Sequence, residues 1–331
     1  MNRRILTLAI PNILSNLTVP LLGTVDTALM GHQEQVELVG AMAVGGMIFS
    51  FVFWGFGFLR MGTTGLTAQA YGGQGVEQAR NILYRASLTG LLIGLLLIVL
   101  QVPLLKLALW IVDASGEVET LTSTYVTIRI YAAPATLLFY VLMGWFLGMQ
   151  NAVYPMILTV VVNGMNVVLD IILVYGAGMD IAGVAWGSVF ARYAGILAGI
   201  YILKRRYPRY LKLPRWDEVV DLGKLKAFFS VNTDIFVRTI SLIFAFSFFT
   251  AKSAEYGDTV LAANTILIQL WMIFSYGIDG FAFAAESLVG RFTGAKDRKG
   301  LARTIKLVFL WGLGIGLLGT AIYGSFARPI L

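Results

Sequence analysis

The apolar residues of this chain form long, nearly uninterrupted runs that are separated by short polar breaks. A helix of about 20 apolar residues is long enough to cross the roughly 30 Å hydrocarbon core of a bilayer. We count about nine such runs and expect each to form one membrane-spanning helix, because only helices or closed barrels satisfy their backbone in lipid. The predicted spans are 5–30, 38–66, 83–104, 125–147, 155–175, 181–203, 227–251, 260–289 and 305–327.

The basic residues collect on one side when these spans alternate across a membrane. Only three basic residues of the loops and span ends fall on the outer side: Lys106, Lys252 and Arg328. The N-terminal side holds Arg3, Arg4, Arg80, Arg85, Lys204, Arg205, Arg206, Arg209, Lys212, Arg215, Lys224, Lys226, Arg291, Lys296, Arg298, Lys299, Arg303 and Lys306. Because cytoplasmic loops carry the excess of Lys and Arg, we expect the N-terminus to be cytoplasmic.

Composition supports the membrane reading and excludes several classes of protein. The chain is 58% hydrophobic and 13% charged, whereas soluble domains are about 25% charged. The net charge of +7 is explained by the loops, so we expect no nucleic-acid partner. With no cysteine and one histidine, His32, we expect no disulfide, no metal site, no enzymatic activity and no cofactor.

Part of the chain repeats after 222 residues. This shift lays Ala41 on Ala263 and Gly72 on Gly294, and it lays the string IGLL at 93–96 on the same string at 315–318. Six spans separate the two copies, so both have the same orientation, as in a parallel repeat about an axis along the membrane normal. We therefore predict an all-α, polytopic transmembrane helical bundle with two pseudo-symmetric halves.

The repeat also predicts how the halves are divided. Residues 1–204 form a bundle of six helices, the basic segment 205–226 forms a cytoplasmic linker, and residues 227–331 form three helices of the second half. A second half with six helices would need about three more after Leu331. The second bundle is therefore expected to be incomplete in this chain.

Seven strings resemble the multidrug and toxic compound extrusion (MATE) transporters, and more closely their DNA-damage-inducible-F-like bacterial branch. They are PNIL at 11–14, GTVDT at 23–27, FLRMGTTGLTAQAYG at 58–72, NVVLD at 166–170, GVA at 183–185, NTDIFVRT at 232–239 and AESLVG at 285–290. The resemblance implies a two-bundle exporter of twelve helices in the bacterial inner membrane, which opens alternately to each side. It implies amphipathic or cationic small molecules as substrates, exchanged for protons, with sodium as the alternative ion.

Charged side chains within the spans are the candidate functional residues, since an ion in hydrocarbon costs at least about 2.5 kcal/mol. Asp26 and Asp170 lie at similar depth in two helices that run outward, and Asn166 lies one turn before Asp170 on the same face. We predict that the three form a proton-coupling and substrate site, and the resemblance points to the same residues. The alternative is that they brace helices that are kinked near Pro11 and Pro20.

Each of the other candidate residues also has a structural interpretation. Asp234 and Arg238, four residues apart, form either a buried ion pair or part of a cavity, and Asp279 is a minor candidate for cation contact. We expect Glu286 to pair with the basic loop 291–306 and to stabilise an inner gate. Tyr131 either joins the polar layer around Asp26 or is an interfacial tyrosine.

The sequence thus predicts a secondary antiporter that exports amphipathic or cationic compounds by alternating access, as a monomer in the lipid bilayer. One alternative is a flippase for a lipid or lipid-linked precursor, which would need a wide cationic cavity for a phosphate-bearing head group. The other is a remnant that transports nothing alone. Substrate identity stays open at this point.

Overall fold

The computed structural model describes residues 1–31, 36–112 and 114–330, and within these ranges every regular element is a helix. The α-helices of the first half are α1 (Asn2–Gly31), α2 (Val36–Gly55), α3 (Phe58–Gly72), α4 (Val76–Val99), α5 (Gln101–Val112), α6 (Gly116–Arg129), α7 (Ala133–Gly148), α8 (Val153–Ile171) and α9 (Asp180–Arg206). A 3-10 turn, η1 (Ile130–Ala132), joins α6 to α7, and a π-helical turn, η2 (Ile172–Gly176), follows α8. Then come η3 (Pro208–Tyr210), α10 (Trp216–Val219), α11 (Leu222–Glu255), α12 (Asp258–Gly294) and α13 (Arg298–Ile330).

The helices match the spans that the apolar runs predict. Within the described residues, 8 helices are long and apolar enough to cross a membrane, and α1 coincides with the remaining predicted span. Three predicted spans are subdivided: 38–66 contains α2 and α3, 83–104 contains α4 and the start of α5, and 125–147 contains the junction of α6 and α7. Pro134, in the first turn of α7, explains the last break, because proline lacks the amide hydrogen that a continuous helix needs.

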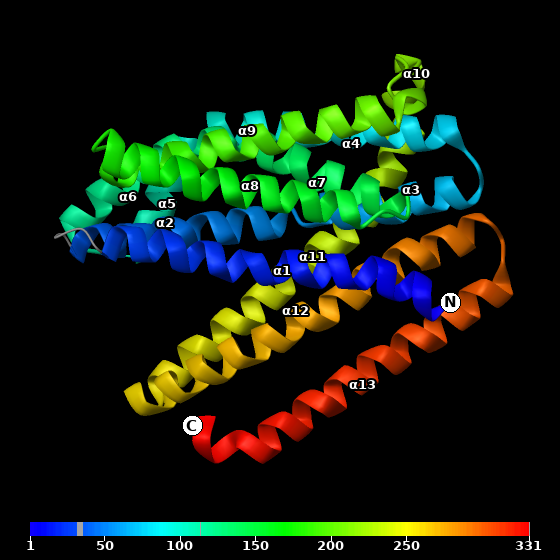
Figure 1. Ribbon diagram of the computed structural model, residues 1–331. Helices are drawn as coiled ribbons and strands as arrows, with labels where there is room; N and C mark the ends of the chain where they lie inside the picture. The colour runs from blue at the N-terminus through cyan, green and yellow to red at the C-terminus, as the bar shows by residue number, and fades with distance from the viewer. Residues whose placement is uncertain (32–35, 113, 331) are drawn as a thin grey trace.

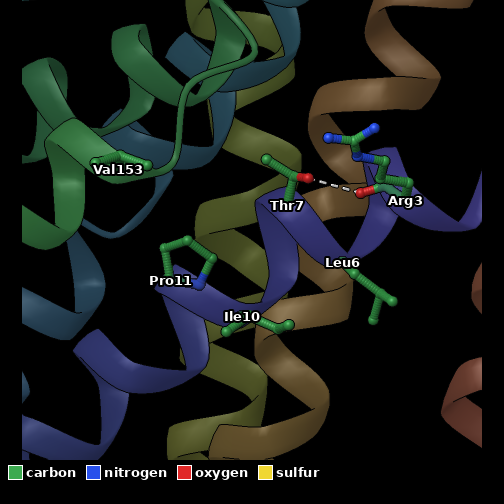
Figure 2. A pocket seen from close by; sticks show the side chains of 6 residues that line it. All are labelled: Arg3, Leu6, Thr7, Ile10, Pro11 and Val153. Atoms are coloured by element: carbon green, nitrogen blue, oxygen red, sulfur yellow. Dashed lines mark hydrogen bonds between the residues drawn. The ribbon is translucent and has the colours of Figure 1, made fainter.

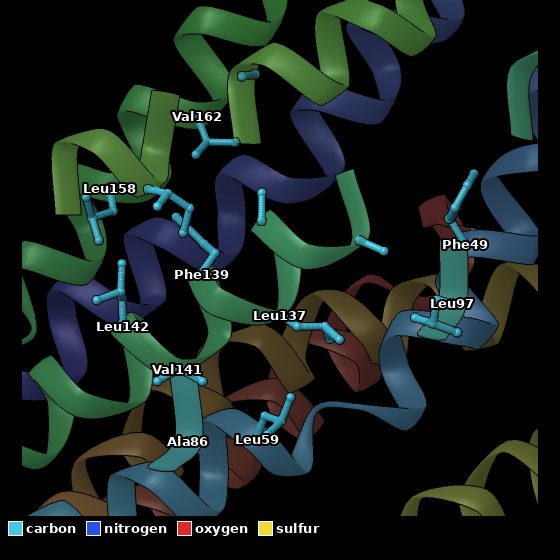
Figure 3. Packing of buried hydrophobic residues seen from close by; sticks show 14 of the residues in the cluster. Phe49, Leu59, Ala86, Leu97, Leu137, Phe139, Val141, Leu142, Leu158 and Val162 are labelled. Atoms are coloured by element: carbon cyan, nitrogen blue, oxygen red, sulfur yellow. The ribbon is translucent and has the colours of Figure 1, made fainter. Parts of the chain in front are cut away.

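Helices α1–α9 form a bundle around the central helix α7. Figure 3 shows Leu137, Phe139, Val141 and Leu142 of α7 among apolar side chains from neighbouring helices. Trp145 near the end of α7 is fully buried, and its indole Nε1 donates to the carbonyl of Ala79 at 3.0 Å. The outer surface of the bundle carries many exposed large apolar side chains, as expected for a surface in contact with lipid.

The segment between α9 and α11 is fixed to the first bundle. Arg85 of α4 donates to the carbonyl of Val219 at 2.9 Å and to that of Glu218 at 2.6 Å. Asn81 donates to the Glu218 carboxylate at 2.6 Å. Burial raises the pKa of Tyr207, which packs against Trp145, to about 12. These contacts hold the segment that leads to the second half against the N-terminal half of α4.

Helices α11, α12 and α13 diverge from the first bundle (Figure 1). We call the end with the N-terminus, the α3–α4 turn, the segment around α10 and the α12–α13 turn the basic end; it lies at the right in Figure 1. At this end α12 packs closely along α3 and along the first half of α1. Further along α1, Asn16 Nδ2 donates to the Tyr276 carbonyl at 3.4 Å. Towards the opposite end, α11–α13 slant away from α2 and α8.

The contact between α3 and α12 is reciprocal. A Cβ added to Gly72 would overlap the carbonyl oxygen of Arg291, and one added to Gly294 would overlap that of Gln69. These two contacts exchange under the 222-residue shift of the repeat. Ala68 and Gly290, which also exchange, meet each other: a Cβ on Gly290 would lie 2.7 Å from the Ala68 Cβ. Such pairing is expected where equivalent helices cross at a two-fold axis, so it supports the pseudo-symmetric architecture.

Candidate functional site

Asn166 and Asp170 form a buried polar pair in α8. The Asn166 Nδ2 atom donates to both carboxylate oxygens of Asp170, at 3.1 Å to Oδ1 and 3.0 Å to Oδ2. Asp170 is completely buried and Asn166 almost so. The spacing of four residues stacks the two side chains on one helical face, as the sequence predicts. The helix changes to the π-helical turn η2 directly after this pair, and such turns are frequent at functional sites.

Helix α9 approaches the Asp170 carboxylate through a residue without a side chain. A Cβ on Gly187 would overlap Asp170 Oδ1 and would lie 3.1 Å from its Cγ. Gly187 is therefore required by space, not by backbone angles. The carboxylate is held between the Asn166 amide on its own helix and the backbone of α9.

Asp26 belongs to α1, but its side chain lies outside the described residues. The register of α1 against α8 is nevertheless defined: Val153 borders the same groove as Ile10 and Pro11, and Asn163 Nδ2 donates to Thr18 Oγ1 at 2.8 Å. Continuing this parallel register brings the helix backbone at position 26 to the level of position 170. The layer predicted for Asp26 and Asp170 involves a side chain outside the described residues, so it stays a prediction.

A small polar cavity of about 50 Å³ borders Asn166. Its wall includes the guanidinium-bearing residues Arg129 of α6 and Arg192 of α9. The remaining wall residues are Phe53, Ala132, Thr136, Val162, Asn166, Ser188 and Ala191. The cavity thus places two cationic side chains within the first bundle, next to the Asn166–Asp170 pair.

Tyr131 is not brought to the Asn166–Asp170 pair by any contact within the described residues. Its ring stacks on Trp186 with 6.4 Å between centroids, and its backbone carbonyl accepts from the Tyr193 hydroxyl at 3.1 Å. The side chain is 41% exposed. This position fits the interfacial interpretation of Tyr131 better than membership of the buried polar layer.

Glu286 pairs with a different partner from the one expected. Its carboxylate lies 3.4 Å from the guanidinium of Arg60 on α3, and the side chains are 15% (Arg60) and 21% (Glu286) exposed. Arg60 also lies over the Phe283 ring, 3.8 Å from its centroid. The prediction of a salt bridge to the basic loop 291–306 is therefore wrong, because α12 turns Glu286 towards α3 instead of along its own axis. The observed pair still joins the two halves.

The other charged residues singled out in the sequence are Asp234, Arg238 and Asp279. Asp234 and Arg238 are both exposed, and within the described part of the chain they form no ion pair with each other, which contradicts the ion-pair alternative of the prediction. A spacing of four residues puts two side chains on one face but does not make them meet. Asp279 of α12 is half-buried and lies within electrostatic range of Arg60 and Arg238.

Two further contacts join the halves near Glu286. Ser287 Oγ donates to the carbonyl of Leu147 at 2.5 Å, and Gln150 Nε2 donates to Ser287 Oγ at 2.6 Å.

A larger groove, of about 480 Å³, lies beside the start of α1 and is mainly apolar (Figure 2). It is open and formed by Leu6, Ile10 and Pro11 near Val153, so it offers hydrocarbon contact rather than a chemical site.

The sequence profile of the MatE family matches residues 11–172 and 235–331, which is more than half of the chain. The chain belongs to the MatE family. The candidate polar pair Asn166–Asp170 and the inter-bundle pair Arg60–Glu286 both lie within the matched ranges. With its apolar helices, family membership makes the chain a multi-pass membrane protein.

Curated relatives in the MatE family cover nearly the whole chain. DNA damage-inducible protein F of Escherichia coli (strain K12) is 40% identical over 294 residues, which are 88% of this chain and 63% of that protein. A probable multidrug resistance protein NorM of Thermotoga maritima is 23% identical, over 99% of this chain and 71% of that protein. The chain spans about three fifths of the length of the first relatives that it matches.

Solved structures of MATE proteins share the fold. A crystal structure of MATE in the bent conformation superposes with a TM-score of 0.92 at 22% identity, covering 99% of this chain and 73% of that one. A MOP superfamily transporter from Pyrococcus furiosus gives a TM-score of 0.87 at 20% identity, over 99% and 72%. These likenesses confirm the all-α, two-bundle architecture.

Sequence reasoning missed three arginines in this MatE chain. Arg60, Arg129 and Arg192 lie within predicted spans, so the rule that singled out the intramembrane carboxylates applies to them equally. Arg60 stands inside a string that resembles the family, where its side chain had no assigned partner. The positive charge of each arginine within a predicted span could have identified it as a candidate, but the side chains that it contacts are known only from the structure.

Proposed function

We propose that this protein is a secondary antiporter that exports amphipathic or cationic small molecules in exchange for protons by alternating access. The relatives named as multidrug resistance proteins support this proposal. The proposed activity is transport and involves no catalysed reaction. The observation that carries it is the completely buried Asp170 carboxylate, whose two oxygens both accept from Asn166.

The Asn166–Asp170 pair suits a site that takes up and releases a proton. An ionised carboxylate away from water is costly, but a side-chain amide compensates part of this cost by donating to it. When the carboxyl group is protonated, the same amide can accept from its hydroxyl through the carbonyl oxygen. Both protonation states therefore have a hydrogen-bond partner. Asp26, at the same level of the bundle, is the proposed second carboxylate.

The arrangement of the halves supports alternating access. The halves are joined near the basic end by the Gly72 and Gly294 contacts and by the Arg60–Glu286 pair. The positive-inside rule favours the cytoplasm for the basic end and a bacterial inner membrane for the chain. In that orientation the described arrangement is closed towards the cytoplasm, and Glu286 acts as part of an inner gate.

Lipid flipping has no supporting contact in the described residues. That alternative needs a wide cationic cavity, whereas the described cavity with Arg129 and Arg192 measures about 50 Å³. We therefore retain drug and toxin export as the proposed function.

The proposal is tested by efflux of ethidium from proteoliposomes that contain this chain, driven in turn by a proton gradient and by a sodium gradient. We expect the proton gradient to drive efflux, and Asp170→Asn to abolish it while ethidium binding persists. Glu255→Gln, at an exposed pair with Lys252, is the matched carboxylate control and should transport normally. Undiminished proton-driven efflux by Asp170→Asn, at equal protein levels, would contradict the coupling role.

A further inference from the structure

The segment 204–216, which leads from the end of α9 towards α11, carries a cluster of exposed basic side chains. They are Lys204, Arg205, Arg206, Arg209, Lys212 and Arg215. Within the described part of the chain none of them takes part in an ion pair. Aromatic rings lie near Arg205 and Arg209, but a ring does not remove the positive charge of a guanidinium. The segment therefore presents positive charge that is available to a partner.

The acidic residues that follow this segment compensate little of its charge. The Glu218 carboxylate accepts from Asn81 of α4 at 2.6 Å, so it is engaged in holding the segment to the bundle. Asp221 precedes α11, and its Oδ1 atom accepts from the backbone nitrogen of Lys224 at 2.8 Å. Asp217 is exposed. The six basic side chains therefore leave a clear excess of positive charge on this side of the protein.

The segment lies beside the first bundle, at the level where the apolar run of α4 begins. The Tyr84 hydroxyl donates to the carbonyl of Leu211 at 3.2 Å, and the neighbouring Arg85 binds the other end of the segment near α10. Arg85 follows Val76, the first residue of α4, by nine residues, which is about 13 Å along the helix. Figure 1 shows α10 beside α4, set back from the α3–α4 turn. This is the level of the lipid head groups, which flank the hydrocarbon core.

Two large apolar side chains project from the same segment. Leu213 is 81% exposed and Trp216 is 54% exposed, whereas Tyr210 and Pro214 are buried. The segment thus has an inner side that packs on the bundle and an outer side that combines basic and apolar side chains. Tryptophan favours the interface between membrane and water, and basic residues beside it favour anionic lipid. The outer side therefore has the composition of a surface that rests on a bilayer.

We propose that this connecting surface, formed by the exposed side chains of residues 204–216, binds the head groups of anionic phospholipids. The basic side chains pair with the lipid phosphates, and clusters of four to eight Lys or Arg next to a membrane-spanning helix are typical of such binding. Leu213 and Trp216 enter the layer between head groups and acyl chains. A lipid surface matches both the charge and the apolar side chains, whereas a soluble polyanion matches the charge alone. The binding does not depend on the transport proposed above.

The test measures which lipid lies next to Leu213. Because the chain has no cysteine, Leu213→Cys accepts a single bimane label. The labelled chain is placed in nanodiscs of phosphatidylglycerol and phosphatidylcholine, in which an equal amount of one lipid or the other carries a nitroxide near the head-group end of an acyl chain. We expect the nitroxide on phosphatidylglycerol to quench the label at least about threefold more strongly than the nitroxide on phosphatidylcholine. Equal quenching by the two lipids would overturn the proposal.

Two controls assign the preference to the connecting surface. A label at Val99→Cys, at the opposite end of α4 and 75% exposed, should be quenched equally by both lipids. With the label at position 213, the double variant Lys212→Gln with Arg215→Gln should reduce the preference by at least about half. Arg298→Gln with Lys299→Gln removes the same exposed charge from the start of α13 and should leave the preference unchanged. A preference that persists in the first double variant, or falls equally in the second, would overturn the proposal.

A nucleic acid is the other partner that a basic surface suits. The quenching measurement is therefore repeated with a single-stranded oligonucleotide of about 20 nucleotides, equimolar with the chain, at about 0.15 M salt. We expect the preference for phosphatidylglycerol to persist, because the oligonucleotide gains nothing from the level of Leu213 and Trp216 beside the hydrocarbon core. Loss of quenching by phosphatidylglycerol on addition of the oligonucleotide would make this a nucleic-acid surface and would overturn the lipid assignment.

Discussion

Gly187→Ala tests whether the backbone of α9 confines the Asp170 carboxylate. The new Cβ would overlap Oδ1 and would also lie 3.3 Å from the backbone nitrogen of Asp170. The carboxylate cannot turn away freely, because Asn166 donates to both of its oxygens. Overpacking of a buried site costs about 1–3 kcal/mol, and a lost hydrogen bond to a charged group costs about 1.5–3 kcal/mol. We therefore expect a loss of at least about 2.5 kcal/mol in the free energy of unfolding.

The assay is thermal unfolding of the purified variants in detergent, followed by tryptophan fluorescence, with Trp186 adjacent to the substitution. For a chain of this size such a loss corresponds to a Tm lower by about 3–4 °C or more. Gly164→Ala on α8 is the matched control: nothing lies within 4 Å of its added Cβ, so its Tm should not fall. In the double variant Gly187→Ala with Asp170→Ala the overlap disappears, so the combined loss should be smaller than the sum of the single losses. An unchanged Tm for Gly187→Ala, or strictly additive losses, would show that the backbone of α9 does not confine the Asp170 carboxylate.

Three further predictions concern other contacts. Glu286→Gln should weaken the junction of the halves, seen as slower cross-linking of cysteines introduced at Gln69 and Ala295, with Glu255→Gln as control; an unchanged rate would count against an inner-gate role. Gly72→Leu and Gly294→Leu should each lower the Tm by a similar amount, because their contacts are reciprocal; a loss at one position alone would contradict the two-fold relation. Burial raises the pKa of Tyr207 to about 12. Between about pH 10 and 12 the unfolded chain therefore releases the Tyr207 proton while the folded chain keeps it, so the free energy of unfolding falls over this range. Tyr207→Phe should therefore show a smaller fall in Tm over that range than the wild-type chain, and an equal fall would be evidence against the burial argument.

The sequence predicts the spans well because hydropathy depends on composition over about 20 residues, which packing does not alter. It misses the breaks at Gly57, Leu100 and Ile130, since the apolar run continues through each of them. The repeat is detectable from matching residues such as Gly72 and Gly294. That these two positions lie at the crossing of α3 and α12 requires the structure.

In the candidate site, too, the sequence predicts some contacts and misses others. Asn166 and Asp170 meet because four residues make about one helical turn. Asp234 and Arg238 have the same spacing, but no ion pair joins them in the part of the chain that the structure describes. Partners distant in sequence, such as Arg60 for Glu286, depend on how helices pack and carry no local signal.

In the proposed mechanism, Asp170 exchanges a proton when a substrate binds. The most direct measurement is the number of protons released per ethidium bound by the purified chain, followed with a pH indicator in weakly buffered detergent solution. We expect proton release by the wild-type chain and by Glu255→Gln, and a clear decrease in Asp170→Asn while ethidium still binds. Equal proton release by the wild-type chain and Asp170→Asn would contradict the assignment of coupling to the buried Asn166–Asp170 pair.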